Sequence, residues 1–133
     1  MLTDITHVTL LVADQDEALE FYTGTLGLVV RDDVEIDEEG MEGRWLTVSP
    51  SDSEFPQIAL VEADTAEKRD RVGSQVADYV NFVFATDDFD ADYDRLREAG
   101  VEFHGEPTEN PWGREVVFED PYGNCHDMLE PAA

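Results

Sequence analysis

One order of predicted elements occurs twice along this chain, and this internal duplication limits the possible folds more than any other feature. A strand at residues 5–12, a helix and three further strands are followed by a second strand, helix and three strands. The first helix begins with an N-cap at residues 14–17 and ends at Gly27, and the second opens at residues 87–90 and ends at Gly100. The sequence therefore predicts an α+β fold built from two βαβββ modules.

The remaining predicted strands are short runs rich in β-branched and aromatic residues: 28–30, 44–48, 57–62, 79–85, 101–103, 114–118 and 125–129. Residues 32–43 are acidic and contain two glycines, which predicts a hairpin or an exposed loop. A second loop is expected between residues 103 and 114.

The chain has 133 residues, which is the size of one domain. We therefore expect a single domain over residues 1–133, made of the two repeats. Module 1 spans about residues 4–63, residues 64–77 form a partly helical connection, and module 2 spans about residues 78–131.

Alignment of the two modules pairs residues of different chemistry. His7 pairs with Asn81 at an offset of 74, and Ala59 pairs with Asp127 at an offset of 68 because the loops differ in length. Side chains alternate between the faces of a strand, so Asp127 and His126 point to opposite faces. We expect His126 to pack against a helix.

The charge is strongly acidic, with 33 acids, 8 bases and a formal net charge of −25. Nucleic acids and anionic membranes are excluded as partners because both require clustered Lys and Arg. The acids are spread along the chain rather than gathered in a tail, which favours a cytoplasmic protein of a salt-adapted (halophilic) organism. The alternative is an acidic surface that binds basic partners.

The cellular compartment follows from two further features. Cys125 is the single cysteine, so no intrachain disulfide can form and nothing indicates an oxidising compartment. No signal peptide and no apolar run of about 18 residues is found, so we expect a cytoplasmic protein without a membrane span.

Several motifs together resemble the vicinal oxygen chelate superfamily, which includes glyoxalase I, the bleomycin- and fosfomycin-resistance proteins and the extradiol dioxygenases. Residues 5–12, 18–22 and 26–28 resemble the opening of that family, and residues 118–124 resemble its closing turn. The resemblance spans about residues 4–131. It implies two sheets that curl around a cleft, usually in a homodimer.

The resemblance also implies metal ligands at four matching positions, which in this sequence are His7, Ala59, Asn81 and Asp127. His7 and Asp127 suit a divalent metal such as Fe, Mn, Ni or Zn, whereas the amide of Asn81 is a weak ligand and Ala59 has no ligand atom. Asp127 is also a candidate general base.

Two functions remain open. The first is a metal-dependent glyoxalase-like enzyme that binds adjacent oxygens of a small molecule and acts as a lyase, isomerase or dioxygenase. The second is a metal-free protein that sequesters a small molecule, as resistance-type relatives do. No flavin, nicotinamide or phosphate-binding motif is found, so a divalent metal is the one cofactor expected.

A small-molecule pocket needs aromatic walls and a few polar groups. The candidate pocket residues are Gln57, Trp45, Trp112 and Arg114. In a chain this acidic, Arg44 and Arg114 are also expected to pair with carboxylates, and His104 is expected in a surface loop.

Overall fold

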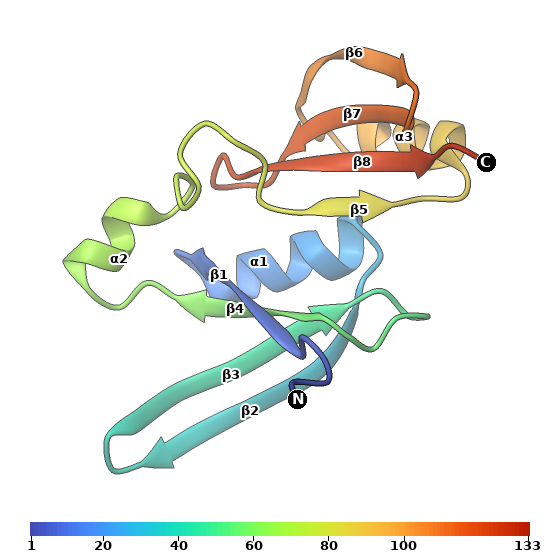
Figure 1. Cartoon of the computed structure of the whole chain (residues 1–133). Coiled ribbons are helices and arrows are strands. Elements are labelled where there is room, and N and C mark those ends of the chain that lie inside the picture. The colour runs from blue at the N-terminus through green and yellow to red at the C-terminus, as the bar shows by residue number, and fades with distance from the viewer. The chain divides into compact units, whose positions relative to one another are not determined.

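The computed structural model describes residues 1–133, apart from the side chain of residue 41, and divides into two compact units (Figure 1). The units are Met1–Val72 and Gly73–Ala133. Each contains one four-stranded mixed sheet, with strand order β1-β4-β3-β2 in the first and β5-β8-β7-β6 in the second. Among the described residues, no helix has the length and apolar character needed to cross a membrane.

The N-terminal unit begins with a strand and a capped helix, as the sequence predicts. Its elements are β1 (His7–Val12), α1 (Gln15–Leu19), a π-helical continuation (Glu20–Thr25), β2 (Val29–Glu38), β3 (Met41–Ser49), β4 (Gln57–Glu62) and α2 (Ala66–Arg71). The Asp14 carboxylate accepts a hydrogen bond of 3.1 Å from the Glu17 amide, which satisfies a free donor of the first turn.

The core of this unit lies between α1 and one face of the sheet. Leu10, Leu46 and Leu60 are almost completely buried on that face. Gln15 joins the helix to the sheet, because its side-chain amide donates to the carbonyl oxygens of Leu60 at 2.8 Å and Arg44 at 3.1 Å. The polar side chain is thereby satisfied inside the core.

The C-terminal unit has the same order of elements: β5 (Val83–Ala85), α3 (Phe89–Glu98), β6 (Phe103–Asn110), β7 (Gly113–Glu119) and β8 (Cys125–Pro131). Its core is an aromatic cluster on the α3 side of the sheet. His126 is fully buried there and stacks on Phe82 with ring centroids 5.2 Å apart and an interplanar angle of 10°. Burial lowers the pKa of His126 to about 4, so the ring packs as a neutral group. The prediction that His126 packs on the helix side is confirmed.

The strand registers confirm the internal duplication. In the parallel pair β1–β4, Thr9 lies opposite Ala59, and in the parallel pair β5–β8, Val83 lies opposite Asp127. Thr9 and Val83 are separated by the same offset of 74 that relates His7 to Asn81. Two four-stranded sheets with equivalent connections therefore carry different side chains at equivalent positions.

Residues 32–43 form the distal part of a long hairpin between β2 and β3, which is the first of the two predicted alternatives, because the acidic side chains do not prevent backbone pairing. Two sequence predictions need correction. Residues 79–82 lie outside β5, which is shorter than predicted. Residues 103–110 form the edge strand β6 in place of the predicted loop, and a register shift between His104 and Thr108 accommodates Pro107. His104 is exposed, as expected, but it lies in this strand.

Gly113 gives a direct test of the β7–β8 pairing. Its φ is +148°, and a Cβ at this position would overlap the Glu130 carbonyl oxygen of the neighbouring strand. We expect Gly113→Ala to lower the free energy of unfolding by at least about 3 kcal/mol, because both backbones would have to separate. Urea denaturation measures this loss.

Gly123 is the matched control, because its φ is +86° but nothing lies within 4 Å of a Cβ. Gly123→Ala should cost only the backbone strain of about 1–2 kcal/mol. Equal losses for the two variants would contradict the close strand contact at Gly113.

Candidate functional site

Each sheet has one face that is turned away from its helix, and we call it the helix-free face. Residues on it follow from strand alternation and register. In the N-terminal unit it carries His7, Trp45, Thr47, Ser49, Gln57 and Ala59. In the C-terminal unit the helix-free face carries Val83, Glu115, Val117, Cys125, Asp127 and Leu129. Asn81 lies two residues before Val83, just outside β5, and alternation assigns it to the same face.

In the N-terminal unit, the polar groups at the centre of this face are already paired. Thr47 and Gln57 are buried, and the Thr47 hydroxyl donates to the Gln57 side-chain oxygen at 2.8 Å. The Asp32 amide donates in turn to the Thr47 hydroxyl at 3.0 Å. Ala59, which is 2% exposed, has no ligand atom. This part of the face is therefore a satisfied polar core rather than a set of free metal ligands.

His7 lies at the rim of the same face and is exposed. Its ring contacts Trp45, with ring centroids 5.4 Å apart and a tilt of 56°. The Nδ1 atom is 2.9 Å from the Thr6 hydroxyl, which fixes one ring nitrogen. His7 and Trp45 together form an accessible aromatic surface.

In the C-terminal unit, Asp127 and Glu115 form a carboxyl pair. Asp127 is only 7% exposed, and burial raises its pKa to about 7, helped by the hydrogen bond and the negative charge of Glu115. The same hydrogen bond lowers the pKa of Glu115, which also accepts from Asn110 at 2.7 Å and from the Trp112 indole at 3.0 Å. The pair therefore keeps a proton up to about neutral pH, because the pKa of Asp127 is raised while that of Glu115 is lowered.

One oxygen of this pair stays unsatisfied. Asp127 Oδ1 is buried and has no hydrogen-bond partner among the residues whose side chains are described. Within the described residues, no N–H or O–H group donates to this oxygen. An unpaired buried acceptor lowers the stability of the folded protein by about 1–3 kcal/mol. A ligand that donates a hydrogen bond to this oxygen restores that stability.

A turn between β7 and β8 determines where Asp127 points. The Asp120 side chain accepts hydrogen bonds of 2.9 Å from the amides of Tyr122 and Asn124, and 2.8 Å from the Asn124 side chain. The Asp120 amide donates back to the Asn124 carbonyl at 2.9 Å. This closed turn sets the register in which Glu119 faces Cys125 and Val117 faces Asp127.

The predicted site residues are distributed between the two units. Asn81, Trp112 and Asp127 lie in the C-terminal unit, and the Glu115 carboxylate links Trp112 to Asp127. Arg114 points to the α3 side, where it pairs with Asp90 at 2.7 Å and covers the Phe89 ring at 4.4 Å. The expectation that Arg44 and Arg114 find carboxylate partners is confirmed, since Arg44 also pairs with Asp16 and Asp33.

The donors at the four family positions fit a metal poorly. They are one imidazole, one amide, one methyl group and one carboxyl group that shares a proton with Glu115. A catalytic metal site needs about three good ligands. His7 and Asp127 are the two residues of this set with the chemistry to bind one.

Sequence reasoning missed Glu115 and Asn110, the partners of the Asp127 pair. The available signal was alternation in the hairpin, because Glu115 and Val117 must share a face with Asp127 once the turn at residues 120–124 is recognised. It also missed His104, Glu119 and Cys125, which come together from three strands.

The Asp127 pair predicts a specific pH dependence of stability. The pKa of Asp127 is higher in the folded protein than in the unfolded chain, so its ionisation disfavours folding. The resulting loss of folding stability is absent below about pH 4. It grows as pH rises and reaches its full size above about pH 7. We expect Asp127→Asn to be more stable than the unmodified protein by about 1–3 kcal/mol at pH 8, with no gain at pH 4.

Urea denaturation at several pH values, with EDTA present, measures this difference. Asp94→Asn, on the exposed side of α3, controls for the removal of one negative charge. A stability gain for Asp127→Asn that is equal at pH 4 and pH 8 would contradict a buried, protonated Asp127.

Comparisons with known proteins agree with this architecture. The model of the Glyoxalase/Bleomycin resistance protein/Dioxygenase superfamily matches residues 4–125. An uncharacterised protein of Shewanella frigidimarina is 37% identical over 98% of this chain and 95% of its own length. The crystal structure of UcmS2 is 37% identical, covers 98% of this chain and 99% of that one, and has a TM-score of 0.83.

The crystal structure of TnmS3, described as an antibiotic binding protein from Streptomyces sp. CB03234, is 33% identical. The match covers 98% of this chain and 98% of the TnmS3 chain, with a TM-score of 0.81. The family model and these relatives extend over nearly the whole sequence, and both modules are included in them. The chain belongs to the glyoxalase/bleomycin resistance protein/dioxygenase superfamily.

Proposed function

We propose that this protein binds and sequesters a small molecule that has an apolar body and at least one hydroxyl or N–H donor. The buried, unpaired Oδ1 of Asp127 is the observation that supports this proposal most strongly. Buried acceptors are usually hydrogen-bonded, and Asp127 Oδ1 is an exception on the face that is not covered by the helix. A ligand donor that reaches Oδ1 completes the hydrogen bonding of the carboxyl pair.

The surroundings of Asp127 suit the apolar part of such a ligand. Val83, its neighbour across the β5–β8 pairing, is 55% exposed, and Trp112 is 58% exposed and hydrogen-bonded to Glu115. Leu129 lies on the same face, opposite Glu115. Apolar groups around one polar group that lacks a hydrogen-bond partner are typical of small-molecule sites.

Two further observations favour binding over metal-dependent catalysis. Ala59 and Asn81 replace strong ligands at two of the four family positions. In addition, the relative TnmS3 is described as an antibiotic binding protein. We propose by analogy that an antibiotic with a hydroxyl or N–H donor is the class of ligand.

The second candidate is a metal-dependent lyase, isomerase or dioxygenase. It is favoured by the presence of His7 and Asp127, an imidazole and a carboxyl group, at two family positions. The two candidates differ in the effect of His7→Ala. That change abolishes activity in the enzyme, whereas the ligand site proposed around Asp127 in the C-terminal unit does not include His7, which contacts Trp45 in the N-terminal unit.

Tryptophan fluorescence tests the binding proposal, because Trp45 and Trp112 are the only two tryptophans. We expect antibiotics with an apolar body and a hydroxyl or N–H donor to quench this fluorescence saturably at one ligand per chain. Asp127→Leu, which removes the acceptor, should weaken binding about tenfold or more, because a hydrogen bond to a buried acceptor contributes about 1–3 kcal/mol.

Trp112→Phe shows whether the quenched fluorescence comes from Trp112 or from Trp45. Asp94→Asn is the control for the removal of one negative charge. Quenching that is unaffected by Asp127→Leu would contradict the role of the carboxyl pair.

We also propose that the protein is a cytoplasmic homodimer adapted to high salt. The dimer is proposed from the family resemblance, and the compartment from the single cysteine. Adaptation to salt is supported by the net charge of −25, because the eight basic residues can neutralise only a small part of the 33 acids. Screening by dissolved ions reduces the remaining repulsion.

Thermal denaturation in a KCl series tests the adaptation. We expect the melting temperature to rise steadily from about 0.05 M to about 2 M KCl, because the Debye length falls to a few ångströms. Sucrose at matched osmolality is the control, since it does not screen charge. A melting temperature independent of KCl would contradict the proposal.

A further inference from the structure

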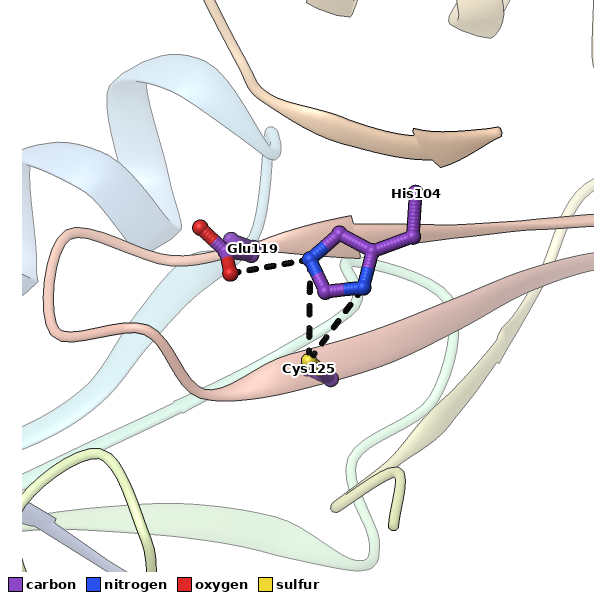
Figure 2. A group of neighbouring side chains, drawn as sticks. All are labelled: His104, Glu119 and Cys125. Atoms are coloured by element: carbon purple, nitrogen blue, oxygen red, sulfur yellow. Dashed lines mark hydrogen bonds and ion pairs between the residues drawn. The ribbon is translucent and has the colours of Figure 1, made fainter. Parts of the chain in front are cut away.

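We propose that His104, Glu119 and Cys125 form a binding site for a zinc-class divalent metal in the C-terminal unit (Figure 2). None of the three occupies a family ligand position, and the nearest such position in the chain, Asp127, lies two residues after Cys125. The site is therefore additional to the small-molecule function proposed above.

The three side chains meet from three adjacent strands. His104 lies at the start of β6, Glu119 ends β7 and Cys125 begins β8. As Figure 2 shows, the imidazole lies between the carboxylate and the thiol. The Nε2 atom is 2.8 Å from Glu119 Oε1, both ring nitrogens are 4.0 Å from Cys125 Sγ, and all ligand atoms lie within 4.8 Å of one another.

These separations are close to those around a bound ion. Bonds of about 2.0–2.3 Å to a tetrahedral zinc put neighbouring ligand atoms about 3.3–3.7 Å apart. The carboxylate would have to move away from the ring by less than about 1 Å, and the thiol toward it by a similar amount. Rotation of exposed side chains achieves this without backbone movement, since His104 is 46% and Glu119 28% exposed.

Backbone contacts hold the three positions in place. The turn stabilised by Asp120 fixes Glu119 opposite Cys125 in the β7–β8 register. The Glu119 amide donates to the Glu102 carbonyl at 2.9 Å, and His104 pairs with Val117, so the start of β6 is fixed against β7. The ligands are thus preorganised, which reduces the cost of assembling the site on binding.

The ligand types select the metal. A thiolate and an imidazole favour zinc and related transition metals over Mg²⁺ or Ca²⁺, which prefer oxygen. Thiolate and carboxylate together neutralise the charge of a divalent ion. Three protein ligands leave the fourth tetrahedral position for water, and the exposed rim gives the ion a path to it.

Cobalt substitution tests this site, because a thiolate–Co²⁺ bond gives a charge-transfer absorption that carboxylates do not. The full-length protein, reduced, treated with chelator and kept in molar KCl, is titrated with CoCl₂. We expect one Co²⁺ per chain with a thiolate charge-transfer band, and displacement of the band by one equivalent of ZnCl₂. We expect Cys125→Ser to abolish the band, and His104→Gln and Glu119→Gln to weaken binding at least tenfold.

Two matched variants separate this site from the other acidic groups and from the small-molecule site. His7→Ala and Asp127→Asn change family positions and should leave the band and its affinity unchanged. No thiolate band, or a band that persists in Cys125→Ser, would overturn the proposal. Loss of the band in His7→Ala with retention in His104→Gln would also overturn it, and would favour a metal at the family positions instead. Circular dichroism confirms that each variant is folded.

Discussion

The Asp120 carboxylate is the group on which the chemistry of the C-terminal unit depends. It is 5% exposed and accepts three hydrogen bonds within the turn between β7 and β8. Because side chains alternate along a strand, a shift of one residue in this register would exchange the two faces of β8. His126 would then leave the aromatic core and Asp127 would enter it. A few hydrogen bonds in one turn thus decide which side chains are core and which can meet a ligand.

The two units have the same backbone fold but carry different side chains on their helix-free faces. Both units use the same strand order, a helix that begins at a capping aspartate and a helix-free face. On that face, the N-terminal unit has Ala59 and the paired Thr47 and Gln57, whereas the equivalent part of the C-terminal unit has the carboxyl pair. The helix side carries apolar and aromatic residues in both units, whereas the helix-free face carries a different set of buried polar groups in each unit.

Much of the fold could be predicted from the sequence, because the strands and caps are local signals. The β4 boundaries, the start of α3 within residues 87–90 and the opposite orientations of His126 and Asp127 follow from periodicity. The β2–β3 hairpin was one of two alternatives, and β6 was missed, since cross-strand pairing overcame its proline-containing composition. The pairing of Glu115 with Asp127 and the meeting of His104 with Cys125 depend on register between strands, and composition contains no such information.

A buried acid in a chain of 33 acidic residues needs a physical reason. Aspartate at position 127 gives the fold nothing that asparagine would not, and it adds a group whose ionisation disfavours the folded state at neutral pH. The neighbouring Glu115 increases that cost, and the unpaired Oδ1 adds to it. Costs of this kind gather at functional sites, because the interaction that compensates them comes from outside the chain. In the proposed function, the stability lost at Asp127 becomes available again when the donor group of a ligand reaches this carboxyl group.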